Sequence, residues 1–172
     1  MMTPQEFQSV YPIVIDWVRQ TLAIHQLNAK AVASRGFPRL PHYFSGELLG
    51  STKYVVVERV PMPPLSTIGL HRFAEFEKAD YDGITYLDTF FVKNRSARSE
   101  RLYFHELIHV VQWRLLGPER FLAAYATGLE TFGYRESPLE RMAYDAEMEF
   151  VRSSEAFDAE KLVATKLGQA SA

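Results

Sequence analysis

The chain of 172 residues contains no cysteine, which excludes disulfide frameworks, thiolate metal sites and cysteine nucleophiles together. It also has no large excess of either charge. A formal net charge of -2 at pH 7 gives no indication of nucleic acid or an anionic membrane surface as a partner. The first residues lack the basic and then apolar regions of a signal peptide, and no apolar run approaches the ~20 residues of a membrane span. We therefore expect a cytoplasmic protein.

The composition is that of a folded chain, because 47% of the residues are hydrophobic and 13% are aromatic. A disordered chain has far fewer apolar groups than this. The length fits one domain with a sizeable core, and the sequence shows neither repeats nor a low-complexity linker. The prediction is a single domain over residues 1–172.

Apolar periodicity and capping residues predict several helices and a few strands. Thr3 and Pro4 begin a helix that should reach the Ala29–Ala33 region. A strand is expected over Lys53–Val60 and a hairpin over Gly83–Val92. After a stop at Gly117 and Pro118, the pattern predicts a short helix, then a turn region containing Gly128 and Gly133, and a last long helix opening at Ser137. The expected fold class is α+β, with a small sheet packed on helices.

The stretch His105-Glu106-Leu107-Ile108-His109 matches the pattern H-E-x-x-H within an apolar helical sequence. Positions four apart on a helix lie on one face, separated by about 6 Å of rise. The two imidazoles can therefore share one Zn²⁺ ion at ~2.0–2.1 Å. Glu106 lies about 100° around the helix from His105, where it can accept a proton from water without ligating the metal.

A short pattern of this kind also occurs by chance, in an ordinary helix whose two histidines are satisfied by hydrogen bonds. The context argues against that alternative, since each buried histidine and the glutamate would need a buried partner of its own. The motif on a helix therefore predicts a zinc site with His105 and His109 as ligands and Glu106 as the catalytic residue.

A catalytic zinc site usually has three protein ligands and one open position, so a third ligand must come from another element. The predicted last helix offers Glu140 and Glu147, with Glu136 just before it. Glu140 also has a structural interpretation, because a glutamate three residues after Ser137 forms a capping box. Spacing alone leaves the choice between Glu140 and Glu147 open.

Together with Gln112, Gly117 and the segment Tyr134–Tyr144, the motif resembles small bacterial gluzincin-type zinc metallopeptidases, sometimes called minigluzincins. The resemblance covers roughly residues 83 to 150. It implies a zincin-like architecture in which the third zinc ligand is the first glutamate of an E-x-x-A pattern, which here is Glu140. It also implies that the stretch from Gly83 pairs along its edge with an extended peptide.

The sequence departs from the better-known gluzincins at one position. Those enzymes place an aspartate four residues after the ligand glutamate to orient the first histidine, whereas Tyr144 stands there in this chain. Either a backbone carbonyl or another acid then orients His105, or the site is tuned differently. Tyr125, Tyr134 and Tyr144 are candidates for stabilising the transition state, although each is also an ordinary core tyrosine.

These observations predict a zinc-dependent metallopeptidase that acts on a peptide or protein substrate. One alternative is a non-catalytic zinc-binding or scaffold protein with a peptidase-like fold, against which the presence of Glu106 argues. A second alternative is metal-assisted hydrolysis of a compound other than a peptide. The sequence does not predict the substrate or the oligomeric state.

Overall fold

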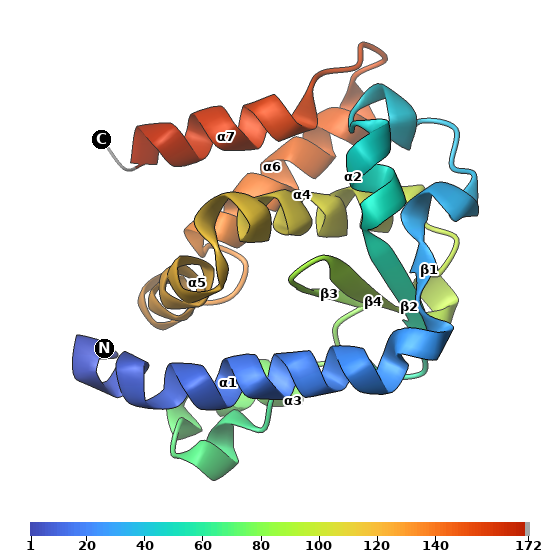
Figure 1. Ribbon diagram of the computed structural model, residues 1–172. Helices are drawn as coiled ribbons and strands as arrows, with labels where there is room; N and C mark the ends of the chain where they lie inside the picture. The colour runs from blue at the N-terminus through green and yellow to red at the C-terminus, as the bar shows by residue number, and fades with distance from the viewer. Residues whose placement is uncertain (171–172) are drawn as a thin grey trace.

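The computed structural model, which describes residues 1–170, has a four-stranded sheet between two helical layers (Figure 1). The strands are β1 (Lys30–Ala31), β2 (Lys53–Val57), β3 (Gly83–Tyr86) and β4 (Thr89–Lys93). Their order in the sheet is β1-β2-β4-β3. The pairing of β2 with β4 is parallel, and the other two pairings are antiparallel.

Within the described residues the chain forms seven α-helices, which confirms the predicted α+β class. They are α1 (Pro4–His25), α2 (Gly46–Ser51), α3 (Ala74–Lys78), α4 (Glu100–Leu116), α5 (Pro118–Phe132), α6 (Pro138–Arg152) and α7 (Ala159–Ala170). Thr3 and Ser99 cap α1 and α4 by accepting hydrogen bonds from backbone N–H groups. No helix over residues 1–170 has the length and apolar character needed to cross a bilayer.

The central strand β4 separates the two layers of the core. All five of its residues are buried, as expected for a strand paired on both sides and covered on both faces. Phe90 and Val92 pack in one hydrophobic cluster with α4, α6 and α7, whereas Phe91 packs in another with Ile15 and Val18 of α1. This alternation follows the two-residue period of a strand, and it places α1 and α4 on opposite faces of the sheet (Figure 1).

The predicted hairpin is confirmed, whereas two other boundaries were wrong. Strands β3 and β4 pair in antiparallel register, and Leu87 in the turn between them has a left-handed φ of 59°. The first helix ends at His25 rather than in the Ala29–Ala33 region, because Lys30 and Ala31 pair with β2. The predicted strand over Lys53–Val60 ends at Val57, where its pairing with β4 also ends.

The interpretation of Gly128 as a turn residue was wrong, because it lies inside α5. That helix has 15 residues and is not the short helix expected. A Cβ atom at position 128 would lie 2.9 Å from the Ser137 Cβ and 3.1 Å from the Pro138 Cδ. The glycine therefore permits close approach between α5 and the beginning of α6. Helix α6 is also not the last helix, since α7 follows it.

Candidate metal centre

The H-E-x-x-H motif lies in the middle of α4, as predicted, and this part of the helix is buried on every side. All residues from Tyr103 to Trp113 are buried, which is typical of a helix at the centre of a protein rather than on its surface. His105 and His109 are each only 5% exposed, and Glu106 is 3% exposed. Three ionisable side chains thus enter the core from adjacent faces of one helix, where each requires a partner.

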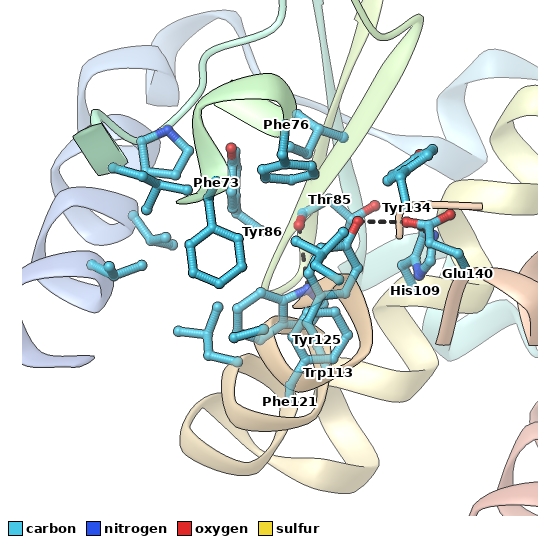
Figure 2. Close-up of a pocket in the computed structure, with 18 of the residues that line it drawn as sticks. Phe73, Phe76, Thr85, Tyr86, His109, Trp113, Phe121, Tyr125, Tyr134 and Glu140 are labelled. Atoms are coloured by element: carbon cyan, nitrogen blue, oxygen red, sulfur yellow. Dashed lines mark hydrogen bonds and ion pairs between the residues drawn. The ribbon is translucent and has the colours of Figure 1, made fainter. Parts of the chain in front are cut away.

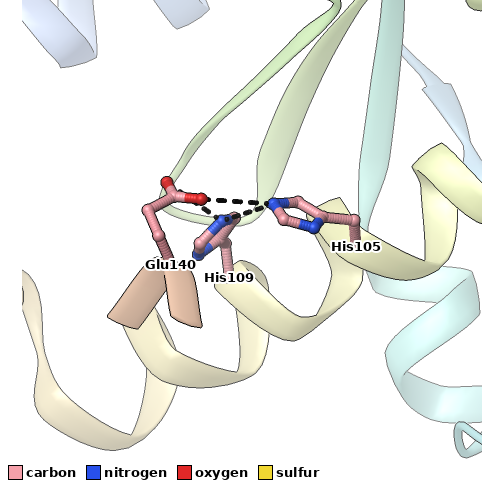
Figure 3. Close-up of side chains that lie close together, drawn as sticks. All are labelled: His105, His109 and Glu140. Atoms are coloured by element: carbon pink, nitrogen blue, oxygen red, sulfur yellow. Dashed lines mark hydrogen bonds and ion pairs between the residues drawn. The ribbon is translucent and has the colours of Figure 1, made fainter. Parts of the chain in front are cut away.

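Helix α6 brings Glu140 against the two histidines (Figure 3). The two histidine Nε2 atoms are 3.1 Å apart. The Glu140 Oε2 lies 3.3 Å from the Nε2 of His105, and the Glu140 Oε1 lies 3.4 Å from the Nε2 of His109. Ligand atoms ~2.0–2.1 Å from one tetrahedral metal ion are themselves ~3.3 Å apart. The three separations are therefore those of a site that could hold a metal ion.

The outer nitrogen of each histidine faces a hydrogen-bond acceptor. The Nδ1 of His105 lies 2.9 Å from the Glu147 Oε2, and an ionised carboxylate can only accept. The Nδ1 of His109 lies 2.8 Å from the Gln112 Oε1, while the Gln112 amide nitrogen donates to the Leu139 carbonyl oxygen at 3.0 Å. Both neutral imidazoles must therefore carry their proton on Nδ1, which leaves both Nε2 atoms as acceptors.

The third member of the group is an acceptor as well. Glu140 is 2% exposed, and its Oε1 accepts a hydrogen bond of 2.6 Å from the hydroxyl of Tyr125 on α5. Its Oε2 is buried and faces the Nε2 of His105 at 3.3 Å. When both imidazoles are neutral, two lone pairs thus converge with the Glu140 carboxylate, an arrangement that a cation, either a metal ion or a proton, would stabilise.

The electrostatics of the group also favour positive charge at its centre. Burial opposes the charged form of His105, but hydrogen bonds with Glu140 and Glu147 outweigh it and raise the pKa of His105 to about 10. Burial likewise opposes ionisation of Glu140, yet the two histidines hold the pKa of this carboxyl well below its usual range. The carboxylate form of Glu140, which is the form that binds metals, is thus the stable one.

Glu106 is held by β3. The Thr85 hydroxyl lies 2.6 Å from the Glu106 Oε2, to which it donates, and 3.2 Å from the Glu106 backbone oxygen. Gly83 faces the same carboxylate, and a Cβ atom there would overlap it. Burial raises the pKa of Glu106, an effect that the two histidines partly offset. The carboxylate is therefore fixed beside the three converging atoms.

The two glutamates that spacing could not separate are in different positions. Glu140 is turned to the histidines, and Ser137 makes no side-chain capping hydrogen bond at the start of α6. The capping-box interpretation of Glu140 was therefore wrong. Glu147 contacts the outer nitrogen of His105 and forms an ion pair with Arg101. Glu147 thus holds the position next to His105 that the departure at Tyr144 left to a backbone carbonyl or another acid.

The three tyrosines take different positions around the group. The Tyr125 hydroxyl donates a hydrogen bond to Glu140. The ring of Tyr144 packs against that of His105 with centroids 4.6 Å apart. The ring of Tyr134 packs against Tyr81 with centroids 4.7 Å apart, and Figure 2 places it next to Glu140 and His109. The contact of Tyr125 with Glu140 is that of a partner of the carboxylate, rather than of a group free to bind a substrate.

Two contacts at the site were not predicted from the sequence, namely those of Gln112 with His109 and of Thr85 with Glu106. Gln112 follows His109 by three residues, and positions three apart are neighbours on a helix, so this contact could have been predicted. Thr85 offered no such signal, because the contact with Glu106 joins a strand to a helix 21 residues further along the chain.

Comparisons with known proteins do not assign the chain to a family. It matches no protein-family model, no curated protein and no solved structure. The class that fold and site define is an α+β protein with a buried group of two histidines and a glutamate that could bind a metal ion.

Proposed function

We propose that this protein is a zinc-dependent hydrolase that cleaves peptide bonds, with His105, His109 and Glu140 as the zinc ligands. The observation that carries the proposal is the convergence of the two histidine Nε2 atoms and the Glu140 carboxylate, with separations of 3.1 to 3.4 Å. Each ligand also has its own outer partner, as is typical of metal-binding residues. The partners are Glu147, Gln112 and Tyr125.

The donor set supports zinc in a catalytic rather than a structural role. Structural zinc sites usually have four protein ligands, whereas catalytic sites have three and leave one position open. Two imidazoles and one carboxylate form such a three-ligand set. When bound there, zinc would supply a Lewis acid that polarises a carbonyl group and makes water more acidic.

Glu106 is the residue to which we assign proton transfer. It would accept a proton from the attacking water and donate it to the leaving amine. The hydroxyl of Thr85 donates to its Oε2, and Glu106 lines the same cavity as His109 and Glu140. A structural zinc site would have no use for this carboxylate, which is why Glu106 favours an enzyme over a scaffold protein.

The position of β3 supports a peptide substrate. It is the outermost strand of the described sheet next to β4. The Asp82 carbonyl accepts from the Lys93 N–H, so the alternation of an antiparallel ladder turns the backbone of Gly83 and Thr85 away from β4. An extended peptide could pair with this edge beside Glu106, although the Thr85 carbonyl already accepts from the Trp113 indole at 3.2 Å.

The experiment that tests the proposal combines zinc analysis with Glu106→Gln. We expect about one zinc per chain in protein prepared without chelator. The variant should keep that zinc and lose about 10²- to 10⁴-fold in turnover on a peptide library, because an amide cannot accept the proton of water. A chain that binds no zinc would overturn the metal assignment. Zinc without hydrolysis in the parent would favour the scaffold alternative.

A further inference from the structure

A cavity of about 110 Å³ opens directly beside the candidate metal centre (Figure 2). Glu106, His109 and Glu140 line one end of it. From there the cavity passes Tyr125 and Phe73, and its far wall is formed by Val10 and Val14 of α1. The site is thus continuous with a pocket whose far side belongs to the N-terminal part of the chain.

Three of the polar groups in the wall of this pocket are already paired within the protein. The Trp113 indole donates to the Thr85 carbonyl oxygen at 3.2 Å, and the Tyr86 hydroxyl donates to the Pro61 carbonyl oxygen at 2.7 Å. The Tyr125 hydroxyl donates to Glu140. Among the residues that line the pocket, the acidic ones are Glu106 and Glu140, both at the metal end. A polar or charged group placed deep in the pocket would lose its hydration without compensation.

The size of the pocket limits the apolar group that could enter it. An apolar cavity of about 150 Å³ is large enough to bind benzene. At about 110 Å³, this pocket is smaller, so an aliphatic group of four or so carbon atoms fits it better than a phenyl or indole ring does.

We infer that the pocket receives a leucine- or methionine-sized aliphatic side chain of the substrate, adjacent to the bond that is cleaved. The inference rests on the proposed function, since the metal end of the pocket is the place assigned to that bond. It gives the N-terminal region a role in the site: α1 and the segment around Leu70 and Phe73 form the wall that selects the substrate.

Small hydroxamic acids can test this directly, because the hydroxamate group binds zinc whatever substituent it carries. The zinc-loaded protein is titrated with acetohydroxamic acid and with analogues that carry an isobutyl, benzyl or carboxymethyl group. We expect the isobutyl compound to bind about tenfold or more tightly than acetohydroxamic acid, as burial of its additional carbons requires. The benzyl and carboxymethyl compounds should gain less. Equal affinities, or a preference for the benzyl or carboxymethyl group, would overturn the inference.

A matched pair of variants on α5 tests whether the isobutyl group binds in the pocket. Ala126 packs against the cluster of Leu65, Leu70 and Phe73 and lines the pocket, whereas Ala124 on the same helix is exposed. Ala126→Phe should abolish the preference for the isobutyl group and leave the affinity for acetohydroxamic acid unchanged. Ala124→Phe should alter neither. If Ala126→Phe does not fold, Ala126→Leu serves in its place. An unchanged preference in the folded pocket variant would refute the assignment.

Failure of the proposed function would give a different result. If no hydroxamate binds, the metal assignment fails, and 4-methylpentan-1-ol then probes the pocket of the metal-free protein by NMR shifts. Shifts in the wall residues that disappear in the pocket variant would support an aliphatic site without a metal. Their absence would overturn the pocket as well.

Discussion

Helix α6 and strand β3 both flank α4, but they act on different side chains of its motif. Helix α6 contributes Glu140 to the inner nitrogens of the two histidines and Glu147 to the outer nitrogen of His105. Strand β3 contributes the Thr85 hydroxyl to Glu106 and, at Gly83, the space that the Glu106 carboxylate occupies. One element thus holds the candidate ligands, and the other holds the proposed base.

If the proposed function holds, the difference means that binding of a metal and transfer of a proton depend on separate parts of this fold. A substitution in α6 should change zinc affinity, whereas one in β3 should change turnover at full zinc occupancy. The predictions that follow test this separation, beginning with the largest expected effect.

Glu140→Gln should weaken zinc binding by more than about 100-fold, beyond the range typical of substitutions in the outer partners of a metal site. The amide removes the negative charge at the centre of the group and leaves the two histidines as the remaining ligands. Competition with a chromogenic chelator measures the affinity. Glu136→Gln is the control, because Glu136 immediately precedes α6 and its side chain is 62% exposed. Unchanged affinity in the Glu140 variant would remove α6 from the metal site.

Gly83→Ala should lower turnover by about 100-fold while zinc affinity stays the same. The added methyl group would lie 2.9 Å from the Glu106 Cδ, so the carboxylate must move, and a displacement of about 1 Å can cost that much in rate. Turnover of zinc-saturated protein on a peptide substrate is the measurement. Gly50→Ala is the matched control, since a Cβ atom there meets no other atom within 4 Å. Loss of zinc in the Gly83 variant would contradict the separation of the two elements.

Glu147→Gln should have the smallest effect, about a tenfold loss of zinc affinity. The amide can still accept the hydrogen bond from His105, but it no longer attracts the proton on Nδ1 with a full negative charge. The same chelator competition measures it, with Glu149→Gln as the control because Glu149 is exposed on the same helix. If Glu147→Gln proves as damaging as Glu140→Gln, Glu147 acts as a ligand rather than as an outer partner.

The sequence predicted those parts of the site that depend on spacing within one element. His105 and His109 share a face because the period of the helix requires it, and the hairpin of β3 and β4 follows from strand-forming residues around a turn. The preference for Glu140 came from a resemblance rather than from spacing, and its contacts support that preference. The likeness to zincin architecture stays a prediction, as does the single domain.

Contacts between elements could not be predicted in the same way. Nothing in the spacing of Thr85 indicates that its hydroxyl meets Glu106, because the relative placement of β3 and α4 depends on packing of the whole core. The same holds for the pocket, whose walls come from α1, from the segment around Phe73 and from α5. Apolar residues in these segments look like ordinary core residues in the sequence, since a pocket wall and a packed interior use the same side chains.

The close approach at Gly128 has a consequence for how such a protein could diverge. The side chains of Ser137 and Pro138 occupy the space that a Cβ atom at Gly128 would take, and Gly128 lies one helical turn after Tyr125, whose hydroxyl contacts Glu140. The spacing between Tyr125 and Glu140 therefore depends on the absence of a side chain at Gly128. Ala126 and Leu129 line the pocket from α5, and substitutions that change their size need not move Tyr125 or Glu140. Relatives could acquire new substrate preferences by point substitution without losing the geometry around Glu140.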